Sequence, residues 1–296
     1  MSLAAALTKV LARSLGGGAV AANSERRLSG GSINTCSRFD SSHGRIFVKH
    51  GAAECLPMFQ AEAAGLAELT KANAARIPKV LAVSSEDGIA LLALEWIELA
   101  TATARSETKF GELLALQHRV TQAQFGWHRD NTIGSTPQSN RTCAHWIEFL
   151  REQRLLPQLT LAANNGANTA LIDGGHALCQ QLDRFFADYR PAPSLLHGDL
   201  WGGNWGVDPS GRPVLFDPAV YYGDREADLA MTRLFGGFGA PFYAAYRSAW
   251  PLDAGAGSRV TLYNLYHVLN HFNLFGGGYL RQAQGMIQRL LAELSR

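Results

Sequence analysis

The chain has 296 residues, of which 47% are apolar and 18% are charged, so it is long enough and apolar enough to bury a core. Its formal net charge is +2 and no Lys/Arg-rich tract occurs, which gives no reason to expect a nucleic-acid partner. The four cysteines are scattered without a C-x-x-C pair, which argues against a zinc site or a disulfide framework and fits a predicted cytoplasmic location.

The first 22 residues carry the pattern of an amphipathic helix. Apolar residues recur at helical spacing, and two basic residues, Lys9 and Arg13, interrupt the apolar run. A signal peptide requires an unbroken apolar core and a cleavage site, so we expect none here. No segment reaches the roughly 18 uninterrupted apolar residues of a membrane span, and we therefore expect no membrane association.

Residues 28–97 predict a small β-sheet crossed by one helix. Glycines near the start of this segment would let two strands turn tightly over a ligand. Alternating and β-branched runs predict the strands, and an alanine- and glutamate-rich run predicts the helix. The predicted elements are, in order, a glycine-rich turn (28–34), a strand (45–49), a helix (57–70) and two strands (79–83 and 89–96) joined by Ser-Ser-Glu-Asp-Gly.

From about residue 108 onward the pattern becomes helical. The polar stretch 130–141 contains Gly134 and Pro137 and is too turn-rich for a helix, so it predicts a structured loop. Long amphipathic runs predict helices at 110–125, 146–156 and 167–189. We therefore expect an α+β fold in which residues 1–97 form a small sheet lobe and residues 98–296 form a larger, mainly helical lobe.

The most informative segment is residues 195–204, Leu-Leu-His-Gly-Asp-Leu-Trp-Gly-Gly-Asn, followed by Pro-Val-Leu-Phe-Asp-Pro at 213–218. It predicts a strand, a polar loop and a second strand. Phosphoryl transfer requires a carboxylate near the attacking hydroxyl and oxygen ligands for Mg²⁺, which Asp199, Asn204 and Asp217 could supply. Taken singly, each motif is equally compatible with an ordinary turn.

The spacing of this segment resembles the catalytic loop of protein kinases, H-x-D-x-x-x-x-N. Asp217 stands where those enzymes have the magnesium-binding aspartate of D-F-G, although the triplet here is Asp-Pro-Ala. By this resemblance Asp199 is the predicted catalytic base, and Asn204 and Asp217 are the predicted magnesium ligands. His197 is interpreted as a structural histidine that hydrogen-bonds the loop.

Upstream residues complete a predicted ATP site. Backbone N–H groups of the glycine-rich turn could cradle phosphates, and a strand lysine paired with a helix glutamate could reach the α- and β-phosphates, as in protein kinases. The end of the last strand would offer backbone hydrogen bonds to adenine. The alternatives are a connecting turn, a solvated lysine and a surface glutamate. The predicted nucleotide-binding residues are Gly30, Gly31, Ser32, Lys49, Glu62, Glu95, Trp96 and Ile97.

Motifs shared with one protein family run along nearly the whole chain. They are Phe47-Val-Lys49, Leu94-Glu-Trp96, Asn-Thr-Ile-Gly-Ser-Thr-Pro-Gln at 131–138, the run at 196–204, and the segment 217–238. In these motifs the sequence resembles the fructosamine kinase family. The resemblance implies a bilobal, protein-kinase-like fold and ATP- and Mg²⁺-dependent phosphorylation of the sugar 3-hydroxyl of ketosamines, the ribulosamine, erythrulosamine or fructosamine adducts of lysine. It also implies a role in protein deglycation.

The resemblance adds residues to the predicted site. Trp201 and the loop that carries Asn131 and Gln138 are candidates for the sugar pocket, since aromatic faces pack against sugar C–H groups; the alternative for each is core packing or a loop staple. Asp228 is expected to hold the catalytic loop in place. The sequence departs from the family at Gly202 or Gly203, where serine is common, and at Asp224, where histidine is frequent, and these departures bear on substrate choice.

Two other functions remain open at this point. Another small-molecule phosphotransferase of the same fold, acting on an aminoglycoside, choline or thiamine, would share every catalytic residue named above. A pseudokinase would bind nucleotide without turnover. The loop at 131–138 and the segment 221–226 favour a ketosamine kinase, and the retained lysine, asparagine and two aspartates argue against a pseudokinase.

Overall fold

A computed structural model describes residues 3–17, 20–21, 24–28, 34–42 and 44–295. The chain divides into two compact units. Unit 1 comprises Met1–Ala102 and Gly206–Asp217, and unit 2 comprises Thr103–Trp205 and Pro218–Arg296. The boundary predicted from the sequence lies at residue 97, and it assigns residues 206–217 to the second lobe, whereas they pack within unit 1. In the described part of the chain, no helix combines the length and the apolar character needed to cross a membrane.

Unit 1 is built on a five-stranded antiparallel sheet with strand order β1-β2-β3-β5-β4. Asp87 and Gly88, between the last two strands, both have positive φ, 52° and 78°, as two-residue hairpin turns require. The elements of the unit are α1 (Leu3–Ser14), β1 (Arg26–Leu28), β2 (Thr35–Ser41), β3 (Gly44–Ala52), a 3₁₀ turn (Ala53–Cys55), α2 (Leu56–Lys71), β4 (Val80–Glu86) and β5 (Ile89–Glu95).

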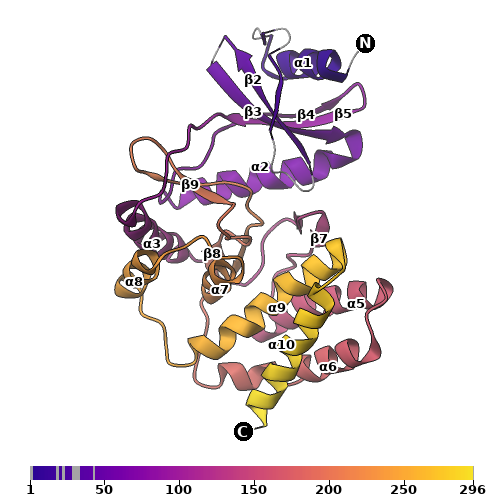
Figure 1. Ribbon diagram of the computed structural model, residues 1–296, viewed down its shortest axis with the longest axis vertical. Coiled ribbons are helices and arrows are strands. Elements are labelled where there is room, and N and C mark those ends of the chain that lie inside the picture. The colour runs from indigo at the N-terminus through magenta and orange to yellow at the C-terminus, as the bar shows by residue number, and fades with distance from the viewer. Residues whose placement is uncertain (1–2, 18–19, 22–23, 29–33, 43, 296) are drawn as a thin grey trace. The chain divides into compact units, whose positions relative to one another are not determined.

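Helices cover both faces of this sheet, α1 on one side and α2 on the other (Figure 1). The inner strand β5 alternates between two apolar clusters, because successive side chains of a strand point to opposite faces. One cluster joins Ile89, Leu91 and Ala93 to Leu7, Val10 and Leu11 of α1. The other joins Ala90, Leu92 and Leu94 to Phe59 and Leu66 of α2. The unbroken apolar run of β5 thus reflects burial on both faces.

The segment 206–217 is tied to unit 1 through Arg76. Its backbone accepts from Leu215 N–H at 3.0 Å and donates to Pro213 O at 2.8 Å, while its guanidinium reaches Asp208 at 2.9 Å and Glu95 at 2.5 Å. The segment contains most of a two-stranded sheet, β9 (Trp205–Val207) and β10 (Pro213–Leu215). These bonds place Asp217, two residues after the end of β10, in the same unit as the lysine-bearing strand β3.

Unit 2 is mainly helical. Its short strands form two antiparallel pairs: β6 (Asn131–Ile133) with β7 (Thr136–Gln138), and β8 (Ser194–Leu196) with β11 (Tyr221–Gly223). Its helices are α3 (Ala104–His118), α4 (Trp146–Phe149), a π-helical turn η2 (Leu150–Leu155), α5 (Leu156–Asn164), α6 (Thr169–Cys179), a 3₁₀ turn (Leu182–Phe186), α7 (Glu226–Leu234), α8 (Ala240–Ala249), α9 (Ala256–Phe275) and α10 (Tyr279–Leu294).

Two predicted helices end earlier than their sequence patterns indicate. Helix α3 stops at His118, because Val120 O accepts a hydrogen bond from Leu195 N–H at 2.8 Å and this tertiary pairing overrides the helical pattern. Helix α6 stops at Cys179, whose carbonyl accepts from Arg151 Nε at 2.8 Å. The polar stretch 130–141, predicted as a structured loop, contains the β6–β7 hairpin.

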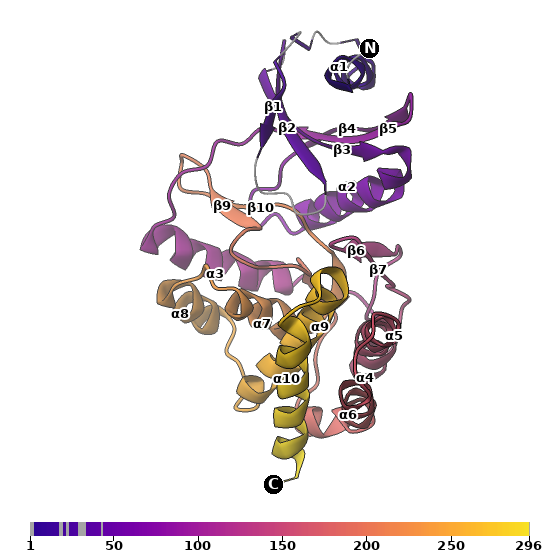
Figure 2. The same cartoon turned by 45° about the vertical axis from the view of Figure 1, so that its right-hand side comes forward.

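Helices α3 and α8 lie side by side (Figure 2), and Gly111 lets their backbones approach. A Cβ at this position would lie 2.3 Å from Phe242 O and 2.9 Å from Tyr246 N, both main-chain atoms that cannot rotate away. The close approach therefore depends on the missing side chain.

We expect Gly111→Ala to lower the free energy of unfolding by about 1–3 kcal/mol, because the added methyl forces the two helices apart. Gly285→Ala is the matched control, since a Cβ on this exposed residue of α10 meets nothing within 4 Å. The control should gain up to about 1 kcal/mol from helix propensity. Urea unfolding of both variants checks the prediction, and an equal effect of the two substitutions would contradict it.

Candidate active site

Lys49 of β3 is buried in unit 1, where its ammonium contacts two carboxylates. It is 6% exposed, and its Nζ lies 2.8 Å from Glu62 Oε1 of α2 and 2.7 Å from Asp217 Oδ1. Burial alone would lower the pKa of Lys49, but the charges of Glu62 and Asp217 outweigh it and raise the pKa above its ordinary value. Burial raises the pKa of Glu62 against the opposing effect of Lys49. The pairing of Lys49 with Glu62 predicted from the sequence is present, and its role in nucleotide binding stays a prediction.

Asp217 has an unusual backbone. Its φ of 56° lies in the left-handed region, which aspartate tolerates better than most residues and which is frequent at functional sites. The side chain is 44% exposed, with one oxygen directed at Lys49. Pro218 follows and fixes the direction in which the chain leaves the strand.

The predicted adenine hinge follows β5. Glu95 N–H donates to Lys79 O at 2.9 Å, and the Glu95 carboxylate pairs with Arg76. Trp96 and Ile97 continue in half-buried, non-helical chain. Gly30, Gly31 and Ser32 lie outside the described residues, so the predicted phosphate-cradling turn has no structural account here.

In unit 2, the predicted catalytic loop joins β8 to β9. Asn204 Nδ2 donates to Asp199 O at 2.8 Å and to Asp199 Oδ2 at 3.1 Å, which brings these two predicted site residues into direct contact. Gly198 precedes Asp199 with φ of 84°, and a Cβ there would lie 2.0 Å from Ala219 O. Only glycine fits this position, so the glycine of His-Gly-Asp is a geometric requirement of the turn.

Asp228, in the first turn of α7, holds the start of this loop. Its Oδ2 accepts His197 N–H at 2.7 Å and its Oδ1 accepts Gly198 N–H at 2.9 Å, while His118 Nε2 lies 3.2 Å from Oδ2. Burial would raise the pKa of Asp228, but the hydrogen bonds donated by His118 and by the backbone outweigh this effect and lower the pKa. The loop is therefore anchored on an ionised carboxylate.

His118 extends this anchor into the core. Burial lowers the pKa of His118, so its ring is neutral: Nε2–H donates to Asp228, and Nδ1 accepts from Tyr246 O–H at 2.8 Å. Arg225 Nη1 in turn donates to the Tyr246 hydroxyl at 3.2 Å. His197, interpreted as a structural residue, is fully buried, and its Nδ1 accepts Asp199 N–H at 3.3 Å.

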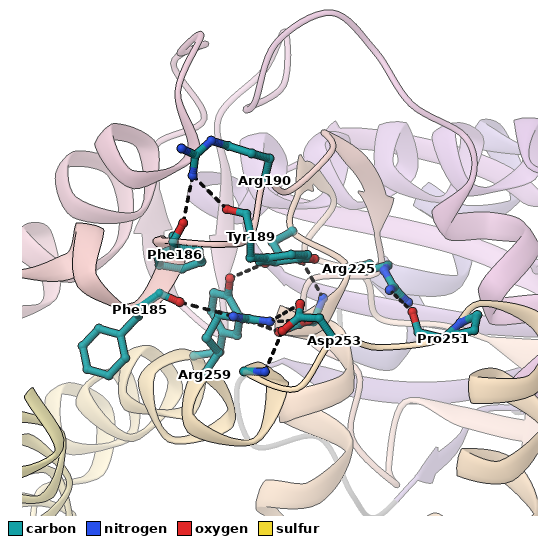
Figure 3. A network of polar contacts seen from close by, with 12 residues as sticks. Phe185, Phe186, Tyr189, Arg190, Arg225, Pro251, Asp253 and Arg259 are labelled. Atoms are coloured by element: carbon teal, nitrogen blue, oxygen red, sulfur yellow. Dashed lines mark hydrogen bonds and ion pairs between the residues drawn. The ribbon is translucent and has the colours of Figure 1, made fainter.

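A second polar network fixes the start of α7 (Figure 3). Arg259 of α9 donates to both oxygens of Glu226, at 2.7 and 3.0 Å, and to Asp253 at 2.6 Å. Asp224 accepts from the hydroxyls of Tyr189 and Tyr263. Burial, followed by the nearby charge of Glu226, raises the pKa of Asp224 to about 7.

Sequence reasoning missed three of these supporting residues. His118 and Arg259 lie far from the loop in the sequence, and their only local signal is a polar side chain on the buried face of a helix, whereas Arg225 is a buried residue that directly precedes α7. The acidic spacing of Asp224, Glu226 and Asp228 before an apolar run was a second signal, because buried carboxylates need partners of this kind.

The three predicted substrate residues differ in accessibility. Trp201 is 39% exposed and makes an edge-to-face contact with Phe235, which is also exposed. A Cβ on Gly203 would lie 2.3 Å from the Trp201 ring, so this glycine makes room for the indole. Asn131 and Gln138 are buried, and their amides bond to Val220 O and Ala219 O. Trp201 is thus open to a ligand, whereas the two amides are engaged within the protein.

We expect Asp228→Asn to destabilise the protein by about 1–3 kcal/mol, because an amide cannot accept from all three donors. A carboxylate with a lowered folded pKa stabilises the protein above its unfolded pKa of about 4, and this contribution is lost as the pH falls through the folded value. The lowered pKa of His118 also reduces the unfolding free energy as the pH falls below about 6.5, because the unfolded histidine then binds a proton more readily than the folded one. Urea unfolding at pH 7.5 and at pH 4 should show the difference between wild type and variant shrinking at acid pH.

The control for this prediction is Asp173→Asn on the exposed face of α6, which should change the unfolding free energy by less than about 0.5 kcal/mol at either pH. A pH-independent difference between wild type and Asp228→Asn would contradict the assignment of Asp228 as an ionised anchor.

Comparison with known proteins places this chain in a family. The family described as fructosamine kinase matches residues 4–293. A probable ketoamine kinase from Synechocystis sp. is 44% identical over 267 residues, 90% of each chain, and the chloroplastic protein-ribulosamine 3-kinase of Arabidopsis thaliana is 40% identical over 90% of this chain and 82% of its own.

Solved structures agree with this placement. The crystal structure of a putative fructosamine-3-kinase from Thermobifida fusca has a TM-score of 0.83 at 32% identity and covers 98% of this chain and 99% of its own. Aminoglycoside phosphotransferase APH(4)-Ia, in ternary complex with ADP and hygromycin B, has a TM-score of 0.67 at 15% identity over 97% of this chain and 98% of its own, a likeness of fold alone. The predicted α+β, protein-kinase-like fold is confirmed, and the chain belongs to the fructosamine kinase family.

Proposed function

We propose that this protein is an ATP:ketosamine 3-phosphotransferase, which phosphorylates the sugar 3-hydroxyl of ribulosamine, erythrulosamine or fructosamine adducts of lysine and so promotes deglycation of proteins. The observation that carries the proposal is the loop geometry, in which Asp199 and Asn204 are in contact and the preceding backbone is anchored by Asp228. Family membership selects ketosamines among the possible acceptors. The four unpaired cysteines support a cytoplasmic location.

In the proposed reaction, Asp199 accepts or orients the proton of the 3-hydroxyl as its oxygen attacks the γ-phosphorus of ATP. The bond to the β–γ bridging oxygen breaks, and ADP leaves. Phosphoryl transfer asks little covalent chemistry of the protein and depends on positioning and charge stabilisation. The Asn204 amide, 3.1 Å from Asp199 Oδ2, holds the carboxylate in one orientation for this role.

The nucleotide side of the proposal rests on Lys49. Its ammonium, oriented by Glu62, would bind the α- and β-phosphates of ATP. Bound Mg²⁺ would neutralise triphosphate charge, and the oxygens of Asn204 and Asp217 are of the type that this ion prefers. The partly exposed carboxylate of Asp217 suits such a ligand role. Glu95, Trp96 and Ile97 are proposed to bind adenine through their backbone.

For the substrate, we assign Trp201 to the sugar pocket, because its exposed ring can pack against sugar C–H groups. Asn131 and Gln138 are assigned a supporting role, since their amide groups are buried and bonded to backbone carbonyls. Gly203 leaves the Trp201 ring free to lie against the loop, which bears on substrate choice.

Phosphate transfer to lysine-linked ribulose, erythrulose and fructose adducts, with ATP and Mg²⁺, tests the function directly. Asp199→Ala should lower kcat by about 10²–10⁴-fold, the range for loss of a positioned general base. Asp183→Ala, on an exposed turn of unit 2, is the control and should retain activity. Absence of transfer to every adduct, despite ATP binding, would favour an aminoglycoside, choline or thiamine phosphotransferase or a pseudokinase.

Lys49→Met should lower kcat/KM for ATP by roughly 10²-fold, because the charge that stabilises the phosphates in the transition state is lost. The KM for the ketosamine should change little. Lys71→Met, an exposed lysine paired with Glu68 at 3.0 Å, is the matched control. If KM rose equally for ATP and for the ketosamine, the result would point to unfolding of unit 1 rather than to a lost contact with the phosphates.

A further inference from the structure

Arg154 is a buried cation whose hydrogen-bond partners are all neutral. It belongs to the π-helical turn η2 and is 1% exposed. Its Nη1 donates to Ser139 O at 2.6 Å and to Gln153 O at 2.9 Å, and its Nη2 donates to Asn140 Oδ1 at 2.7 Å. The rings of Tyr221, Phe149 and Tyr266 surround the guanidinium at 4.1, 4.6 and 5.7 Å. Among the described residues it forms no ion pair, unlike the equally buried Arg259.

This guanidinium is the first member of a hydrogen-bonded series of amide side chains, those of Asn140, Asn131 and Gln138 (the amide series). Because Asn140 Oδ1 accepts from Arg154, Asn140 Nδ2 is left to donate, and it does so to Asn131 Oδ1 at 3.0 Å. Asn131 Oδ1 also accepts from Gln138 Nε2 at 2.8 Å. Tyr266 O–H donates to Gln138 Oε1 at 2.6 Å, which fixes the second end of that amide. A guanidinium has donors only, so its bond to Asn140 Oδ1 favours one donor and acceptor direction in the amides that follow; Asn140 Nδ2 also donates to Arg129 O at 3.0 Å in that same direction.

The last hydrogen bonds of the amide series go to backbone carbonyls beside the catalytic loop. Asn131 Nδ2 donates to Val220 O at 2.8 Å, and Gln138 Nε2 donates to Ala219 O at 3.2 Å. Ala219 N–H donates to His197 O at 2.9 Å, and Ala219 O lies where a side chain on Gly198 would stand. The peptides at 219 and 220 are therefore held by the amides on one side and packed against residues 197 and 198 on the other.

We propose that Arg154 is a positioning residue for phosphoryl transfer. By fixing the donor direction of Asn140, Asn131 and Gln138, it holds the peptides at 219 and 220 against the catalytic loop and so places Asp199, the residue that follows Gly198. This inference rests on the proposed function for its kinetic readout. It also predicts a local structural effect that is independent of the substrate.

The first test compares Arg154→Met with Arg154→Lys. Methionine fills much of the volume but cannot donate, so kcat should fall by about tenfold to a hundredfold while the KM for ATP stays within about twofold. Lysine is again a donor-only group and should restore most of kcat. The matched control is Arg151→Met in the same π-helical turn, where the lost bond to Cys179 O lies outside the amide series. All assays run where circular dichroism shows each variant folded.

The second test changes Gln138, the last amide of the amide series. Gln138→Glu keeps the side-chain size but replaces a donor with a carboxylate oxygen, so it should resemble Arg154→Met. If both act through the amide series, the double variant should lose no more than about threefold beyond the worse single variant. Fully multiplicative losses would show two independent effects and would overturn the proposal.

Hydrogen exchange supplies the readout that does not depend on turnover. In Arg154→Met the amide of Ala219 and those of residues 196–200 should exchange at least about tenfold faster, while amides of α10 keep their wild-type rates. Uniformly faster exchange, or failure of lysine to restore either readout, would overturn the positioning role. If wild type phosphorylates no ketosamine, the proposed function fails, and the exchange measurement still decides the role of Arg154.

Discussion

A single buried carboxylate, that of Asp228, sets the geometry on which the candidate site depends. It accepts two successive backbone N–H groups from the loop and a ring N–H from His118, so one charge joins α7, α3 and the loop. An ionised group in the interior is tolerated only when its acceptors are satisfied in this way. Asp199 directly follows Gly198, whose N–H bonds to Asp228. The position of Asp199 is therefore fixed through helices α7 and α3 rather than by the loop alone.

Features encoded within a few residues could be predicted from the sequence. Apolar runs on either side of a polar turn predicted β4 and β5, helical spacing predicted α1 and α2, and the resemblance to protein kinases predicted the pairing of Lys49 with Glu62. Features that join distant segments could not be predicted. His118 meets Asp228 across 110 positions, and no local pattern distinguishes it from any other polar residue on α3.

The polar loop at 131–138 was open to two interpretations from the sequence, a sugar pocket or a loop staple. Polar residues at 131–138 suggested a ligand-facing surface, yet Asn131 and Gln138 are buried, because their amides satisfy main-chain carbonyls that would otherwise lie in the interior without donors. A polar side chain in a loop can serve the backbone as well as a ligand. The same ambiguity affects the helical pattern after His118, where pairing with Leu195 replaced the last predicted turns.

The course of the chain through its two units also has a consequence for how the molecule can be divided. Residues 206–217 leave unit 2, complete unit 1 and return, so neither unit is one continuous stretch of sequence. A fragment ending at residue 102 would lose the partners of Arg76 on β10 and at Asp208, and unit 2 made in one piece would need a linker in place of those twelve residues. Gene fusions, split reporters and circular permutants of this protein must therefore respect a topology in which the smaller unit is finished only late in synthesis.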